Sequence, residues 1–66
     1  MNVMVNGETR NVPEGQTVRE ILSFLNYQFD HLAVAINHEC VPRSTFDEHL
    51  VNDGDDIEIL SPMAGG

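Results

Sequence analysis

The stretch Thr17-Val-Arg-Glu-Ile-Leu-Ser-Phe-Leu-Asn26 decides the fold, because it carries the helical pattern of the chain. Thr17 and Glu20 stand at the spacing of a capping box, in which each side chain can bond a backbone N–H group at the helix start. Apolar residues then recur three and four positions apart, which is the period of a helix with one buried face: Val18, Ile21, Leu22 and Leu25. The sequence therefore predicts an amphipathic helix that begins after Thr17 and ends at Asn26.

A β-hairpin is predicted before this helix. Val3 and Val5 alternate with polar or flexible neighbours, and Thr9 to Val12 forms a second short extended run. Asn6-Gly7 lies between the two runs. Asn-Gly is a strong hairpin signal because both turn positions need a positive φ, which glycine adopts freely and asparagine better than most residues.

The run Leu32-Ala-Val-Ala-Ile36 follows the helix and is almost entirely apolar. Its length suits a strand buried on both sides, so we expect it in the middle of the sheet. Alternate residues of a strand share a face. The three larger side chains are therefore expected to face the helix, and Ala33 and Ala35 to leave the opposite face smooth.

The rest of the chain predicts short elements that complete a sheet. Cys40-Val41 is a brief strand that Pro42 confines to an edge, and Ser44 to Asp47 opens a helical turn. Asn52 to Asp55 is a turn, and Asp56 to Ser61 is the closing strand with its isoleucines facing inward. The order is strand, strand, helix, strand, short strand, strand.

This order predicts an α+β protein of the β-grasp class, with one main helix packed across a mixed sheet of four to five strands. We expect residues 1–61 to form the β-grasp domain. Residues 62–66, Pro62-Met-Ala-Gly-Gly66, are too small to pack and are expected to form a flexible C-terminal tail.

Length and charge limit the possible functions. A chain of 66 residues buries only about 60% of its unfolded surface, which leaves little room for a preorganised pocket and argues against an independent enzyme. The net charge of −8 disfavours binding to nucleic acid and to anionic membranes. The acidity either keeps the protein soluble or steers it toward a basic partner.

The sequence also predicts a location and a state. No segment approaches membrane-spanning length, and the N-terminus lacks the pattern of a signal peptide, so we expect a cytoplasmic protein. A single cysteine cannot form an internal disulfide, which fits a reducing compartment. A monomer is expected for a freely diffusing protein.

The C-terminal glycine pair suggests a chemical role for the Gly66 carboxylate. A carboxylate reacts with nucleophiles only after conversion to a better acyl donor, such as an acyl adenylate, and a second protein must carry out that step. Its active site would admit the tail through a narrow channel, where the small Ala64 and Gly65 permit close approach of the backbone. Bulk at Gly65 or Gly66 should then block activation without unfolding the domain.

Along its whole length the chain resembles the ThiS-type ubiquitin-like sulfur carriers of thiamin biosynthesis. The resemblance rests on motifs in the family's order and spacing: Gly15-Gln-Thr-Val18, Ala35-Ile-Asn37, Val41-Pro-Arg43, Asp53-Gly-Asp55 and Ala64-Gly-Gly66. Pro62 is a departure, since a more pliable or apolar residue is common there.

The resemblance implies a carrier that acts as a substrate of other enzymes and binds no cofactor itself. A ThiF-like enzyme would adenylate Gly66 with ATP and Mg²⁺. A cysteine desulfurase would supply the sulfur of a C-terminal thiocarboxylate, and thiazole synthase would consume it. Two alternatives share the fold and the tail: a carrier for molybdopterin or another thiolation pathway, and a ubiquitin-like modifier that attaches to lysines. A third is an interaction domain whose glycines are incidental.

An apolar patch beside the tail is predicted as a docking site for a partner. Leu60 alternates outward from the isoleucines of the last strand, and with Met63 and the Ala33/Ala35 face it would form an exposed apolar surface. Patches of this kind mark partner sites, whereas scattered surface apolar residues need no explanation.

Cysteine and histidine offer rival sites. Cys40 lies beside Val41 in an apolar strand context, which predicts that its thiol is packed in the interior and takes no part in sulfur chemistry. The histidines do not stand at the paired spacings of zinc sites, so we expect surface or turn positions and no metal: His31, His38 and His49.

Overall fold

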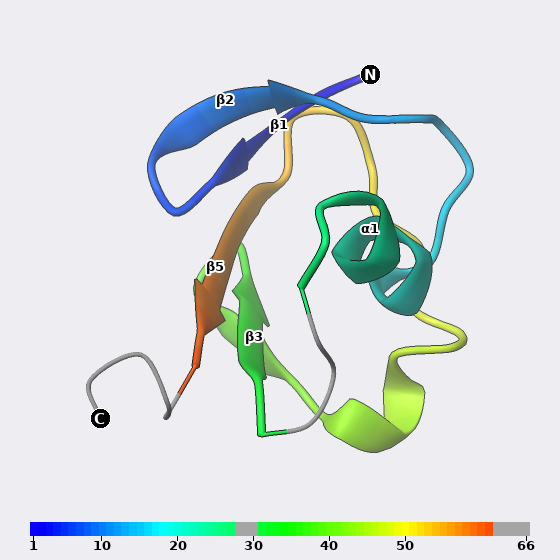
Figure 1. Ribbon diagram of the computed structural model, residues 1–66, viewed down its shortest axis with the longest axis vertical. Coiled ribbons are helices and arrows are strands. Elements are labelled where there is room, and N and C mark those ends of the chain that lie inside the picture. The colour runs from blue at the N-terminus through cyan, green and yellow to red at the C-terminus, as the bar shows by residue number, and fades with distance from the viewer. Residues whose placement is uncertain (28–30, 62–66) are drawn as a thin grey trace.

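The computed structural model describes residues 1–27 and 31–61, and in this part of the chain one face of a five-stranded sheet packs against one α-helix (Figure 1). The elements follow the predicted order, with a short 3-10 helix (η1) before the last strand. Their bounds are β1 Asn2–Val5, β2 Glu8–Asn11, α1 Val18–Phe24, β3 Ala33–Ile36, β4 Glu39–Val41, η1 Arg43–Thr45 and β5 Asp56–Leu60.

The strand order is β2-β1-β5-β3-β4, so the last strand of the chain occupies the centre of the sheet. β5 runs parallel to β1 and antiparallel to β3, and each of these neighbours forms a hairpin with its own edge strand. The prediction that residues 32–36 form the middle strand is therefore wrong by one position. β3 has a partner on both sides, as its apolar run requires, but the central place belongs to β5.

Both hairpins have two-residue turns with positive φ. Asn6 and Gly7 have φ values of 50° and 86°, which confirms the predicted Asn-Gly turn. Asn37 and His38, between β3 and β4, have φ values of 52° and 71° without a glycine. In both turns the asparagine comes first, and its tolerance of the left-handed region allows the tight reversal.

The capping box that was predicted at the start of α1 is present. The Thr17 hydroxyl accepts from the Glu20 N–H, and the Thr17 N–H donates to Glu20 Oε1 over 2.9 Å. Asn26 has a φ of 66°, which ends the helix at the predicted place. A helix of seven residues is marginal alone in water, so its packing against the sheet must hold it in place.

The core lies between α1 and the sheet. Ile21 and Leu22 of the helix are each 1% exposed, and they share the interior with the larger side chains of residues 32–36, as expected. Phe46, which follows η1, is also 1% exposed. The complete cluster is Val3, Val5, Val12, Val18, Ile21, Leu22, Leu32, Val34, Ile36, Val41, Phe46, Val51, Ile57 and Ile59. No helix among the described residues is long and apolar enough to cross a membrane.

Candidate functional site

The proposed chemistry of this chain lies beyond the end of β5. The predicted activation and threading residues, Ala64, Gly65 and Gly66, fall outside the described residues, and so does the predicted docking residue Met63. The described structure therefore bears on the strand that leads to the tail and on the surface around it.

The face of the sheet opposite α1 carries the other predicted docking residues. Leu60 is 68% exposed, and the register places it directly opposite Ala33 on β3. Ala35 is half-buried and lies opposite Glu58. We call the outward residues of β5, β3 and β4 the open sheet face: Ala33, Ala35, Cys40, Glu58 and Leu60.

This face is less uniformly apolar than predicted. Leu60 and Ala33 form an apolar end beside the start of the tail, while Glu58 places a carboxylate next to Ala35. The sequence already contained the signal for Glu58, because Glu58 and Leu60 are two positions apart in one strand and must share a face. The open sheet face thus combines a small apolar spot with a negative charge.

Cys40 is exposed, and the prediction of a packed thiol is wrong. Its neighbour Val41 is buried, but adjacent residues of a strand point to opposite faces. The burial of Val41 therefore turns Cys40 outward, where it lies opposite Ala35 on the open sheet face. In a strand, a buried apolar neighbour in sequence therefore indicates the opposite, exposed face and not burial.

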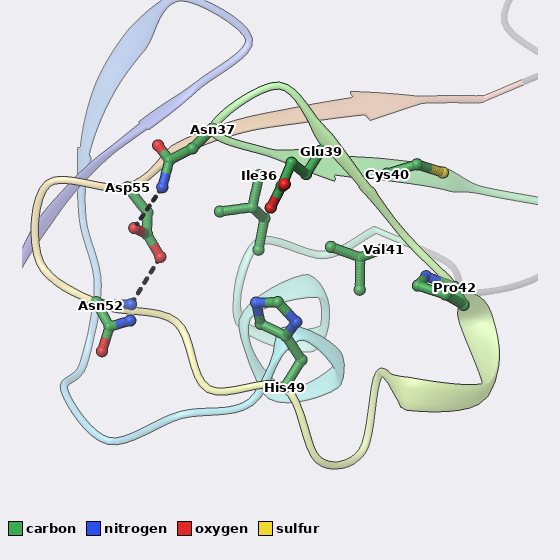
Figure 2. Close-up of a pocket in the computed structure, with 9 residues that line it drawn as sticks. All are labelled: Ile36, Asn37, Glu39, Cys40, Val41, Pro42, His49, Asn52 and Asp55. Atoms are coloured by element: carbon green, nitrogen blue, oxygen red, sulfur yellow. Dashed lines mark hydrogen bonds between the residues drawn. The ribbon is translucent and has the colours of Figure 1, made fainter.

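A hollow of about 190 Å³ lies near the β3–β4 turn. Its walls include Glu39 and His49, whereas the sulfur of Cys40, at its rim, points away from its centre (Figure 2). The full lining is Ile36, Asn37, Glu39, Cys40, Val41, Pro42, His49, Asn52 and Asp55. Its volume is below the few hundred Å³ that typically enclose a small-molecule ligand.

Asp55, which is 8% exposed, joins two turns at this hollow. Its carboxylate accepts from the Asn52 N–H over 2.8 Å and from Asn37 Nδ2 over 3.1 Å (Figure 2). These bonds give the buried carboxylate its hydrogen-bond partners. A structural role therefore explains why Asp55 is buried. The sequence predicted only a turn and a family motif at Asp55, because its partner Asn37 lies in the turn between β3 and β4 and is distant in the sequence.

The histidines do not converge. His31, His38 and His49 are all exposed, as expected for surface or turn residues. Within residues 1–27 and 31–61, no three His, Cys, Asp or Glu side chains are grouped so that they could hold a metal ion.

Comparison with known proteins gives matches that cover both the folded domain and the terminal glycines. The model of the ThiS family matches residues 3–66, which includes the sheet, the helix and the terminal glycines. This chain belongs to the ThiS family. The crystal structure of the ThiS thiamine biosynthesis protein from Geobacter metallireducens superimposes with a TM-score of 0.86 at 40% identity, and each chain is covered completely. This match confirms the predicted β-grasp fold.

Two kinds of curated relative bear on the function of this ThiS-family chain. The Escherichia coli sulfur carrier protein ThiS is 38% identical, with both chains covered completely. The ThiS sulfur carrier of Thermus thermophilus is 33% identical over 64 residues. A thiazole synthase of Paramagnetospirillum magneticum is 39% identical over all 66 residues, but these make up 20% of that protein. In that relative, a segment similar to this chain is thus part of a longer polypeptide.

Proposed function

We propose that this chain is a sulfur carrier whose C-terminal Gly66 carboxylate is activated and thiolated by other enzymes, for use in thiazole synthesis. The observation that carries the proposal is the match to the ThiS family over residues 3–66, which extends through the terminal glycines. Two relatives named as sulfur carriers have about the same length as this chain.

In the proposed series of reactions, a ThiF-like enzyme binds ATP and Mg²⁺, and this chain binds neither. A Gly66 carboxylate oxygen attacks the α-phosphorus of ATP and pyrophosphate leaves. The terminal sulfur of a desulfurase persulfide then attacks the acyl carbon and AMP leaves. A thiol reductant cleaves the resulting S–S bond and releases the thiocarboxylate.

The open sheet face supports a docking role for the residues beside the tail. We infer that Leu60, Ala33 and Ala35, with Met63, contact the activating enzyme while Ala64 and Gly65 lie in its channel. Leu60 is largely exposed and adjoins Ala33 across the β5–β3 pair, so it can be buried in a complex without disturbing the core.

Thiazole synthase is the proposed consumer of the sulfur. The support is the relative named thiazole synthase in which a segment similar to this chain occupies a fifth of the polypeptide. Segments joined covalently meet at a high effective concentration, which suits a carrier and the enzyme that consumes its cargo. We further propose that the protein acts as a monomer in the reducing cytoplasm.

The decisive experiment combines the protein with a ThiF-like enzyme, a cysteine desulfurase, cysteine, ATP, Mg²⁺ and a thiol reductant. Intact mass spectrometry should show one oxygen replaced by sulfur at the C-terminus. Deletion of Gly66 should abolish the product while circular dichroism stays unchanged. Isopeptide-linked conjugates in place of the thiocarboxylate would point instead to a protein modifier, and an unmodified wild-type chain would overturn the proposal.

A further inference from the structure

The C-terminal half of β5 loses its backbone neighbour on one side. β1 ends at Val5, where the chain turns back at Asn6 and Gly7. The last backbone bond from this side runs from the Asn6 N–H to the Ile57 carbonyl over 2.9 Å. Without a substitute, the polar backbone groups of Ile59 on the β1 side would have no partner.

The Asn6 side chain supplies that substitute. Its Oδ1 accepts from the Ile59 N–H over 2.8 Å, and its Nδ2 donates to the Ile59 carbonyl over 3.2 Å. One carboxamide thus pairs with both backbone groups of a single residue and continues the parallel ladder by one further step beyond Ile57. Ile59 directly precedes Leu60, and residues 62–66 follow shortly after.

The position suits asparagine for two separate reasons. Its φ of 50° is in the left-handed region, which glycine and asparagine tolerate best. Glycine would permit the turn but could not bond Ile59, and aspartate would retain the acceptor but lose the donor. The residue therefore serves both the turn and the end of β5.

We propose that Asn6 is a positioning residue that fixes the end of β5 and thereby the place and direction in which the C-terminal residues leave the sheet. The inference rests on the proposed function, in which Gly66 must enter the active site of another protein. If the end of β5 were loose, more residues would have to be ordered on binding, and preorganisation would be lost.

A matched control exists at the other end of the same strand. Asn37 also occupies a hairpin turn at positive φ, and its Oδ1 accepts from the Asp56 N–H over 3.0 Å. Asn6→Gly and Asn37→Gly each remove a carboxamide that bonds β5, and neither adds strain at its φ. They differ in which end of β5 they release, and Asn37→Gly also removes the bond from Asn37 Nδ2 to the buried Asp55 carboxylate.

The first measurement is amide hydrogen exchange on the isolated protein, which does not depend on the proposed function. Asn6→Gly should accelerate exchange of the Ile59 amide by about fivefold or more, the factor expected for the loss of one hydrogen bond. Asn37→Gly should accelerate the Asp56 amide and leave Ile59 unchanged. If Asn6→Gly leaves Ile59 exchange unchanged, the proposed anchor is wrong.

The second measurement is ATP-dependent activation by a ThiF-like enzyme. Asn6→Gly should raise the KM for the carrier by about fivefold with little change in kcat, because the added cost falls on binding. Asn37→Gly should stay close to wild type, and Asn6→Asp, which keeps the acceptor but sets a second carboxylate oxygen against the Ile59 carbonyl, should not retain the wild-type KM. Equal effects of Asn6→Gly and Asn37→Gly would overturn the positioning role, whereas failure of the wild type would overturn the proposed function alone.

Discussion

At the scale of single residues, the exposed thiol of Cys40 gives the first prediction. Because its side chain lies on the open sheet face, Cys40→Ser should change the free energy of unfolding by less than about 0.5 kcal/mol. The neighbouring Val41 is buried, so Val41→Ala should cost about 2 kcal/mol. Urea unfolding of both variants measures the difference. A loss for Cys40→Ser as large as that for Val41→Ala would mean that the thiol is packed.

Single residues also show where sequence patterns stop being informative. The Asn6-Gly7 pair identified a turn, because positive φ is a local property. The bond from Asn6 to Ile59 spans 53 positions and depends on β5 lying beside β1. The bond between Asp55 and Asn37 depends likewise on two turns meeting in space. The residues near Asn6 and Asp55 in the sequence give no sign of these distant partners. The two hydrogen bonds therefore could not be predicted from the sequence.

At the scale of elements, local signals were sufficient for the helix and the hairpins. The capping box at Thr17 and the apolar stripe that follows it predicted the start of α1 at Val18 and its end to within two residues. The strand order was less accessible, because the place of β5 between β1 and β3 is set by pairing between distant segments. β1, β3 and β5 are all interior strands with buried apolar residues, and their composition alone did not show which is central.

The open sheet face, formed by β3, β4 and β5, gives a prediction at the scale of elements. Leu60→Asp should lower kcat/KM for ATP-dependent activation by about tenfold or more, because a carboxylate would have to be desolvated at the inferred contact. Leu50→Asp is the matched control, since Leu50 is 56% exposed but pairs with Thr17 away from this face. It should retain activity near that of the wild type.

Steady-state activation assays at varied carrier concentration test the comparison. Circular dichroism should show that both leucine variants remain folded, as expected for substitutions at largely exposed positions. Equal losses for the two variants would argue that the effect comes from added negative charge, not from contact at Leu60.

At the scale of the whole molecule, the net charge of −8 has two possible explanations. The salt dependence of the association rate with the activating enzyme distinguishes them. If the charge steers the carrier to a basic surface on the activating enzyme, the association rate should fall by about tenfold or more between low and high salt. The dissociation rate should change much less. If the charge serves only to prevent aggregation, the association rate should be nearly independent of salt. Stopped-flow association across a range of NaCl concentrations measures this.

Two variants, each of which removes one carboxylate, test which part of the surface charge affects the association rate. Glu58→Gln removes a carboxylate from the open sheet face, whereas Glu14→Gln removes one from the exposed loop before α1, and both change the net charge equally. Steering toward the open sheet face predicts a slower association and a weaker salt dependence for Glu58→Gln than for Glu14→Gln, because interactions between exposed charges decay within about 10 Å at 0.1 M salt. Identical rates for the two variants would mean that net charge acts without regard to position, and the enzyme would then approach this chain without preference for the face that carries Leu60.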